Sequence, residues 1–473
     1  MGKFNITNFF VYRWRYWIGY SLVVIGLIAT LIFVGLYLPG GISNAEMHSV
    51  AQSSITNLAN LTNIDIANMP YHLLQHISLA IFGISILSIK LPSIILAFLS
   101  IIGIVMLLRQ WFKPRISVLA SLIAITTGQF LFIAQNGTAD IMYVFWPVWL
   151  MLIASLIPYQ KHLRPLFIIA FCATAALSLY TPLSIYVLVA FAVAILIHPH
   201  LRYIVKKLPR FELITGAAVI LLITAPLIVS IIKTPDIILT LLGIPSSWPN
   251  IGTNITSLSI QYLGFAKLGG TTTLITPFFE LGSILIILIG LYRLFQTRET
   301  AKSYTIALWI LCLMPILVLN PTFTSITFLP LLILLAYGLS ELLSYWYSLF
   351  PRNPYARIIG LVPIVILVTV LVLSGMSRYI YSYKYDPNIV PNFSNDIKLI
   401  PKTTTNLVVG NSELAFYDVF AKYNKTVAVS TIPTTDRFLA TRAAKQSITG
   451  YTIEQIITRS TSNDSDRFYL YKK

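Results

Sequence analysis

The sequence predicts an all-α polytopic membrane protein followed by a small α/β domain. The chain of 473 residues is 56% hydrophobic and only 10% charged, whereas soluble globular proteins carry about 25% charged residues. Apolar runs long enough to cross a hydrocarbon core of about 30 Å recur between residues 17 and 377. The composition then becomes polar. We therefore expect a transmembrane domain over residues 1–377 and a soluble domain over residues 378–473.

The apolar runs predict about eleven transmembrane helices. The first run, Trp17–Leu38, is longer than the hydrophobic region of a signal peptide and precedes no small-residue cleavage site, so we expect it to be retained. Tyr71–Ser88 is nearly long enough to span the membrane, but His72, Gln75 and His76 give it a polar side. This pattern favours a helix at the interface or a re-entrant segment. The other predicted helices are 91–108, 116–134, 141–157, 165–180, 183–197, 212–232, 277–295, 304–319, 325–346 and 357–377.

Basic residues alternate between the two sides of these predicted helices. The opposite side from the N-terminus holds only Lys90, Lys233 and Lys267 outside the tail. Since Lys and Arg are enriched in cytoplasmic loops, we expect a cytoplasmic N-terminus and an extracytoplasmic tail in a multi-pass protein of the cytoplasmic membrane. The net charge of +17 then reflects topology, and we expect no nucleic-acid partner. The N-terminal side holds Lys3, Arg13, Arg15, Arg109, Lys113, Arg115, Lys161, Arg164, Arg202, Lys206, Lys207, Arg210, Arg293, Arg298, Lys302, Arg352 and Arg357.

The tail is expected to be a small α/β domain. Asn406–Val409 and Thr426–Val429 are short β-rich runs, and Arg467–Tyr471 is typical of a last strand. Phe416–Lys422 and Thr435–Gln446 are predicted to be helical. The tail has no glycine-rich phosphate loop, so its sequence does not indicate catalysis.

Carboxylates on the outer side are the candidate catalytic groups, because ionisable residues near membrane depth are costly and are functional candidates by default. Glu46 follows the first helix, where it could be a general base or could only stabilise the first turn of a short interfacial helix. Asp140 begins the fourth helix and could be only its N-cap. Both emerge on the same face of the membrane, so they could share one site.

Metal ligands are poorly represented in the sequence. His72 and His76 have the i, i+4 spacing that suits a metal ion, but this spacing alone is a weak signal and ordinary interfacial histidines are the favoured interpretation. Cys172 and Cys312 both lie inside apolar runs, which excludes a disulfide scaffold or a cysteine-based zinc site. We therefore predict no metal ligand and no defined cofactor, and the need for a divalent metal ion stays open.

Several motifs follow a pattern seen in a known family. Gly41–Glu46 forms an acidic outer loop, and Leu74–Gly83 is an interfacial helix followed by Lys90–Ser93, similar to an R-L-P-S start of the second helix. Further matching segments are Arg109–Arg115, Ala134–Asp140 and Leu177–Pro182. Together they resemble the GT-C superfamily of membrane glycosyltransferases, in its bacterial branch related to protein O-mannosyltransferases and the lipid A aminoarabinose transferase. The resemblance is good over about 38–200 and mainly hydropathic beyond.

This resemblance implies an inverting transfer of one sugar from a polyprenyl-phosphate donor, at the bilayer surface, to a protein, glycan or lipid acceptor outside. In the family an Asp-Glu pair follows the first helix, and its first acid is usually assigned as the catalytic base. Ala45 occupies that position here. Glu46 would then act alone, or Asp65 or Asp140 would replace the missing acid. We expect Glu46 and Asp140 to be catalytic.

The donor phosphate needs a cation, and the family often carries a basic residue before the tenth helix. Asn320–Pro330 contains none, so Lys233 or Lys267 could contact the phosphate instead. We expect these two lysines, with Asp65, His72 and Gln75, to bind substrate. Two alternatives stay open: a catalytically inactive GT-C homologue, and a lipid-linked sugar flippase or transporter.

Overall fold

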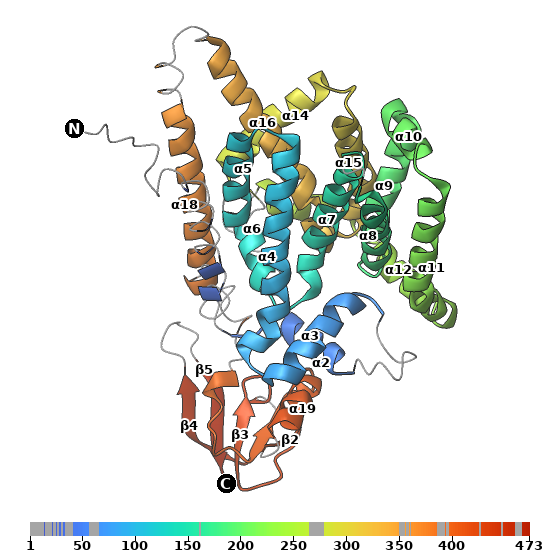
Figure 1. The fold of residues 1–473 in the computed structure, drawn as a ribbon. Coiled ribbons are helices and arrows are strands. Elements are labelled where there is room, and N and C mark those ends of the chain that lie inside the picture. Colours follow the sequence, from blue (N-terminus) through green and yellow to red (C-terminus); the bar gives the residue numbers. More distant parts are fainter. Residues whose placement is uncertain are drawn as a thin grey trace, which may run out of the picture.

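A computed structural model of the protein describes residues 41–55, 66–159, 162–263, 279–349, 361–385 and 397–473, with short gaps at 425–426, 446–447 and 459–465 and scattered single residues elsewhere. The predicted first helix lies largely outside the described residues, and Asp65 and Lys267 lie wholly outside them. The helices form one elongated body, and the C-terminal sheet lies at one end of it (Figure 1).

Long apolar helices make up this body. Within the described residues, six helices are long and apolar enough to cross a membrane, or eight if each of two bent pairs is one span. The chain is thus a multi-pass membrane protein, as predicted, whereas this count does not establish eleven spans. The six are α4 (Ile86–Trp111), η2 with α7 (Ala139–Ile141 and Met142–Leu156), α11 (Arg210–Lys233), α15 (Ala301–Leu319), η3 with α16 (Pro321–Thr327 and Phe328–Leu349) and α18 (Leu361–Tyr385).

The predicted helix 116–134 is not continuous. It consists of α5 (Pro114–Thr126) and α6 (Gly128–Gln135), whose axes differ by 63°. Thr127 between them has extended backbone angles, and its hydroxyl accepts a hydrogen bond from the Phe130 N–H as the N-cap of α6. The capping side chain replaces a backbone hydrogen bond that the bend removes. Hydropathy alone did not reveal the break, because the apolar run continues through it.

A second bend follows α9 (Ser184–Ile197), where α10 (Pro199–Lys206) turns away by 95°. Pro199 explains this bend, because proline disfavours helical angles at the residue before it, and His198 is accordingly extended. Two shorter apolar helices, α8 (Arg164–Ser178) and α14 (Leu281–Gln296), complete the body.

Short helices lie in the two long loops that separate the predicted helices 17–38 and 91–108, and 212–232 and 277–295, both on the predicted outer side. The first loop contains α2 (Asn44–Ile55) and α3 (Met69–Phe82). With 14 residues α3 is about 21 Å long, shorter than a hydrocarbon core, and it is not among the candidate spans. Gly83 ends α3 with φ of +68°, and α4 starts three residues later. The second loop contains α12 (Asp236–Leu242) and α13 (Ile251–Leu263).

The tail folds into a five-stranded sheet with the strand order β2-β1-β3-β5-β4. β1 pairs in parallel with β2 and β3, whereas β5 pairs antiparallel with β3 and β4. The helix α19 (Leu414–Tyr423) follows β1 and matches the prediction for Phe416–Lys422. The strands are β1 (Asn406–Val408), β2 (Ala428–Ser430), β3 (Arg437–Thr441), β4 (Thr452–Thr458) and β5 (Asp466–Lys472).

The helix predicted over Thr435–Gln446 is wrong. Its centre is β3, the middle strand of the sheet, in which Phe438 to Thr441 are all buried. Alanine, leucine and lysine favour a helix locally, but pairing with β1 on one side and β5 on the other satisfies the backbone of this segment as a strand. The edge strand β4 was not predicted.

The tail packs against the first outer loop. Ile42, Met47 and Val50, in and beside α2, share one apolar cluster with Phe416 and Phe420 of α19. Contacts between α2 and α19 and the position of α3 above the sheet are visible in Figure 1. The fold therefore brings the loop that carries Glu46 and the C-terminal domain to the same end of the helical body.

Candidate functional site

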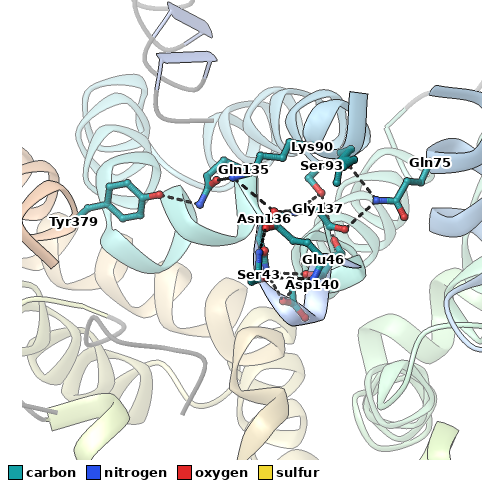
Figure 2. Close-up of polar contacts among 12 residues, drawn as sticks. Ser43, Glu46, Gln75, Lys90, Ser93, Gln135, Asn136, Gly137, Asp140 and Tyr379 are labelled. Atoms are coloured by element: carbon teal, nitrogen blue, oxygen red, sulfur yellow. Dashed lines mark hydrogen bonds and ion pairs between the residues drawn. The ribbon is translucent and has the colours of Figure 1, made fainter. Parts of the chain in front are cut away.

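The turn Asn136–Asp140, which follows α6 and includes the start of η2, is where three parts of the chain meet (Figure 2). The N-terminal turn of α2 approaches it through Glu46, and α4 approaches it through Lys90 and Ser93. The start of the predicted fourth helix thus lies beside the first outer loop. This placement agrees with the expectation that Glu46 and Asp140 lie on one face of the membrane.

Glu46 is completely buried. Its Oε2 accepts a hydrogen bond from the Ser43 N–H at 2.8 Å, and Ser43 Oγ accepts one from the Glu46 N–H at 3.2 Å. This reciprocal pair is a capping box, which starts α2. The other oxygen, Oε1, accepts a hydrogen bond from the Gly137 N–H at 2.7 Å and lies 3.6 Å from Lys90 Nζ. Both carboxylate oxygens are therefore engaged, and Glu46 joins α2 to the turn.

Lys90 is also fully buried and extends the network away from Glu46. Its Nζ donates to Gln135 Oε1 at 2.8 Å, and Gln135 Nε2 donates to the Tyr379 hydroxyl at 2.9 Å. Tyr379 lies on α18, so the chain of contacts links the first outer loop to the last described transmembrane helix (Figure 2). A buried ammonium is stable only where such partners replace its hydration.

Gln75 closes the other side of the turn. Its Nε2 donates to the carbonyl oxygens of Gly137 and Ile89, at 3.0 and 3.1 Å. Its Oε1 accepts from Ser49 and Ser53, both on α2, at 2.8 and 2.6 Å. The side chain is buried with every polar atom engaged, which explains why a glutamine sits on the polar side of α3.

The two histidines of α3 both contact one serine of α2. His72 Nδ1 lies 2.9 Å from Ser53 Oγ, and His76 Nδ1 lies 3.0 Å from the Ser53 carbonyl oxygen. Their i, i+4 spacing therefore serves to hold α3 against α2. In the described ranges, no three or more His, Cys, Asp or Glu side chains form a group suited to a metal ion.

Asp140 differs from Glu46 because it is half-buried. Its Oδ2 accepts hydrogen bonds from Thr138 Oγ1 at 2.7 Å and from Asn136 Nδ2 at 3.2 Å. No donor among the described residues reaches its Oδ1. Asp140 is thus a carboxylate held in place through one oxygen, with the other oxygen able to accept a proton.

Tyr71 lies on the α3 side of the same turn. Burial raises the pKa of its phenol well above the usual value, so the hydroxyl stays protonated. That hydroxyl contacts Ser93 Oγ at 2.8 Å, and Ser93 donates to the carbonyl oxygen of Asn136. These neutral groups fix the backbone of the turn from which Asp140 projects.

The structure does not bring every predicted site residue to this turn. Glu46, Gln75 and Asp140 converge on it, and His72 lies one contact away through Ser53. Lys233 is exposed at the end of α11, a helix that packs mainly against α8.

Lys90, Gln135 and Tyr379 were not predicted as site residues. The available signal was a lysine at the start of an otherwise apolar helix, which requires a buried partner. Tyr379 gave no such signal, because it lies 244 residues from Gln135 along the chain.

Comparisons with known proteins agree with this fold. Residues 69–229 match the sequence model of a family described as dolichyl-phosphate-mannose-protein mannosyltransferase. The chain superimposes on ArnT from Cupriavidus metallidurans bound to undecaprenyl phosphate with a TM-score of 0.55 and 12% identity, covering 96% of this chain and 98% of that one. The apo state of that protein gives a TM-score of 0.53 at 12% identity, with 96% and 97% covered. No curated protein matches the sequence significantly.

The chain therefore has the GT-C fold of membrane glycosyltransferases, over almost its whole length. The matched segment 69–229 contains α3, α4, the turn Asn136–Asp140 and Lys90, so it covers most of the described network. The resemblance predicted from the motifs between residues 38 and 200 is confirmed.

Proposed function

We propose that the protein is an inverting glycosyltransferase that moves one sugar from a polyprenyl-phosphate donor to an acceptor at the outer face of the cytoplasmic membrane. The observation that carries this proposal is Asp140, whose free Oδ1 projects from a turn fixed by buried contacts. The fold shared with a protein solved with bound undecaprenyl phosphate supports the donor class. The mannosyltransferase family matched by residues 69–229 supports a sugar as the transferred group.

Asp140 is the proposed general base. The acceptor nucleophile attacks C1 of the sugar, its proton passes to Asp140 Oδ1, and the bond between C1 and the phosphate oxygen breaks. The electron pair of that bond leaves with polyprenyl phosphate, and attack opposite the leaving group inverts C1. A base must lie within hydrogen-bond reach of the proton that it takes, so the acceptor is proposed to bind at the accessible side of the half-buried Asp140.

Glu46 has a different proposed role. Because both of its oxygens are engaged and it is fully buried, it positions the turn that carries Asp140. Ala45 stands where the resembling family carries its first acid, and among the described residues of this site Asp140 is the proposed replacement. The leaving phosphate requires a cation, and Lys233 and Lys267 remain the proposed candidates.

Replacing Asp140 and Glu46 separately by amides tests this assignment. We expect Asp140→Asn to lower kcat by at least about a hundredfold, the usual contribution of a general base, with normal folding. We expect Glu46→Gln to reduce both activity and thermal stability. The readout is release of polyprenyl phosphate from a panel of polyprenyl-phosphate sugars, including the mannose donor. Asp236→Asn, an exposed carboxylate at the start of α12, is the matched control, and full activity in both test variants would exclude the site.

One alternative has its own support. Ala45 in place of an acid, together with the fully engaged Glu46, also suits a catalytically inactive homologue that binds the lipid donor. The same donor panel separates the two functions, because binding of a donor without transfer to any acceptor would favour the inactive homologue.

A further inference from the structure

An apolar cavity lies at the end of the helical body away from the C-terminal sheet. It has a volume of about 370 Å³ and is lined by α7, α8, α9, α10 and the start of α15. Figure 1 shows α10 at that end of the body, opposite the sheet. Glu46 and Asp140 are not among its lining residues, so this cavity is separate from the proposed transfer site.

The helix α10 covers the cavity with its apolar face. Leu201, Ile204 and Val205 of α10 line the cavity, with the i, i+3, i+4 spacing that places side chains on one helix face. Leu208, just past the end of α10, lines it too. Arg202, Lys206 and Lys207 lie between them on the other face and are exposed. Since α10 turns away from α9 by 95°, it has the composition and orientation of a helix lying in a membrane interface.

Lys302 brings a positive charge to the cavity wall. It lines the cavity and is half-buried. Its Nζ donates to the Trp111 carbonyl oxygen at 3.1 Å and lies 5.0 Å from the centre of the Trp111 ring. No carboxylate among the described residues pairs with it. An ammonium has three donors, so two remain for a ligand.

We propose that this cavity binds an anionic phospholipid from the leaflet that surrounds α10. One acyl chain occupies the apolar cavity, and the phosphate of the headgroup contacts Lys302. The exposed basic residues of α10 add long-range attraction, since each Lys or Arg near an anionic surface contributes to lipid binding. Charge complementarity and the apolar interior together select a lipid with an anionic headgroup.

Lipid binding to the purified full-length protein tests the proposal. Phosphatidylglycerol and phosphatidylcholine with identical chains are titrated, and bound lipid is counted by native mass spectrometry. We expect wild-type protein to prefer phosphatidylglycerol. Lys302→Met should weaken phosphatidylglycerol binding at least roughly tenfold, as expected for one hydrogen bond to a charged group. It should weaken phosphatidylcholine binding less, because the choline cation already offsets the charge of that phosphate.

Two further variants complete the design. Ala154→Phe fills the cavity without changing charge, and it should weaken binding of both lipids. Lys113→Met removes an exposed lysine that does not line the cavity, and it should change neither. Equal losses in Lys302→Met and Lys113→Met would show diffuse surface attraction and overturn the proposal. Unchanged binding of both lipids to Ala154→Phe would also overturn the proposal. That result would stand even if Lys302→Met failed to fold.

Discussion

Glu46 and Lys90 carry opposite charges in a region where neither side chain reaches solvent. Burying an ion pair costs desolvation free energy that the attraction between the charges only partly returns. The pair is stable here because Gly137, Ser43 and Gln135 supply hydrogen bonds to the remaining polar atoms. The network therefore couples the two charges, and the loss of either one removes a contact that offsets the desolvation of the other.

A double-mutant cycle on this pair should show strong coupling. We expect Glu46→Gln and Lys90→Met each to reduce the free energy of unfolding by about 3–5 kcal/mol, because each removes one partner of a buried ion pair. The double variant should lose far less than the sum of the two. Unfolding in mixed detergent micelles measures these values.

The exposed pair Arg437–Glu454, with an Nε–Oε2 distance of 2.9 Å, is the control. Glu454→Gln should change the free energy of unfolding by less than about 1 kcal/mol, as is usual for surface pairs. Additive losses at Glu46 and Lys90 would show that the two charges do not depend on each other.

The sequence predicted part of this site. Glu46 and Asp140 were expected on one face of the membrane, and both reach the turn at Gly137. Their different roles could not be predicted, because they depend on burial: Glu46 lies under Lys90, whereas Asp140 stays half-exposed. Such differences are set by tertiary packing and leave no local pattern in the sequence.

Among the elements, α14 and α16 pack closely through glycines. A Cβ atom on Gly290 would meet the Leu334 backbone carbonyl, and one on Gly338 would meet the Ile286 backbone carbonyl. Small residues allow such close approach of helix backbones within membranes, where dispersion contacts replace the hydrophobic driving force. The glycines therefore fix the distance between these two helices.

Alanine substitution at two helical glycines should change the free energy of unfolding in opposite directions, lowering it at Gly290 and raising it at Gly252. Gly290→Ala should destabilise the protein by about 1–3 kcal/mol, the usual cost of overpacking, despite the better helix propensity of alanine. Gly252→Ala on α13 is the control, because its Cβ would meet only the Asn250 side chain at 3.4 Å. Thermal unfolding in detergent measures both. A stabilising Gly290→Ala would contradict the close contact.

Element prediction succeeded where hydropathy alone decides the structure. The predicted helices 91–108 and 212–232 correspond to α4 and α11, each a few residues longer. It failed at Thr127, where one capping side chain divides an apolar run, and at β3, where strand pairing outweighs helix propensity. Hydropathy does not record hydrogen-bonding partners that are distant in the sequence.

At the scale of the whole molecule, the two ends of the helical body differ in chemistry. One end carries α2, α3, the turn at Gly137 and the C-terminal sheet, joined by the cluster of Met47 and Phe420. The other carries α10 with Arg202, Lys206 and Lys207 (Figure 1). Because basic residues favour the cytoplasmic side, the orientation predicted from the sequence would place the proposed transfer at the outer end and the proposed lipid binding at the inner end.

Cysteine labelling in intact cells tests this orientation. In a background with Cys172 and Cys312 replaced by alanine, Lys422→Cys on α19 should react with a membrane-impermeant maleimide without permeabilisation. Lys206→Cys on α10 should react only after the membrane is opened, because both native side chains are exposed and differ only in the end of the body on which they lie. The reverse pattern would invert the orientation and move the proposed transfer site to the cytoplasmic face. Labelling of both residues in intact cells would place α10 and the C-terminal sheet on the same side of the membrane. That result would contradict a bilayer that crosses the helical body between these two ends.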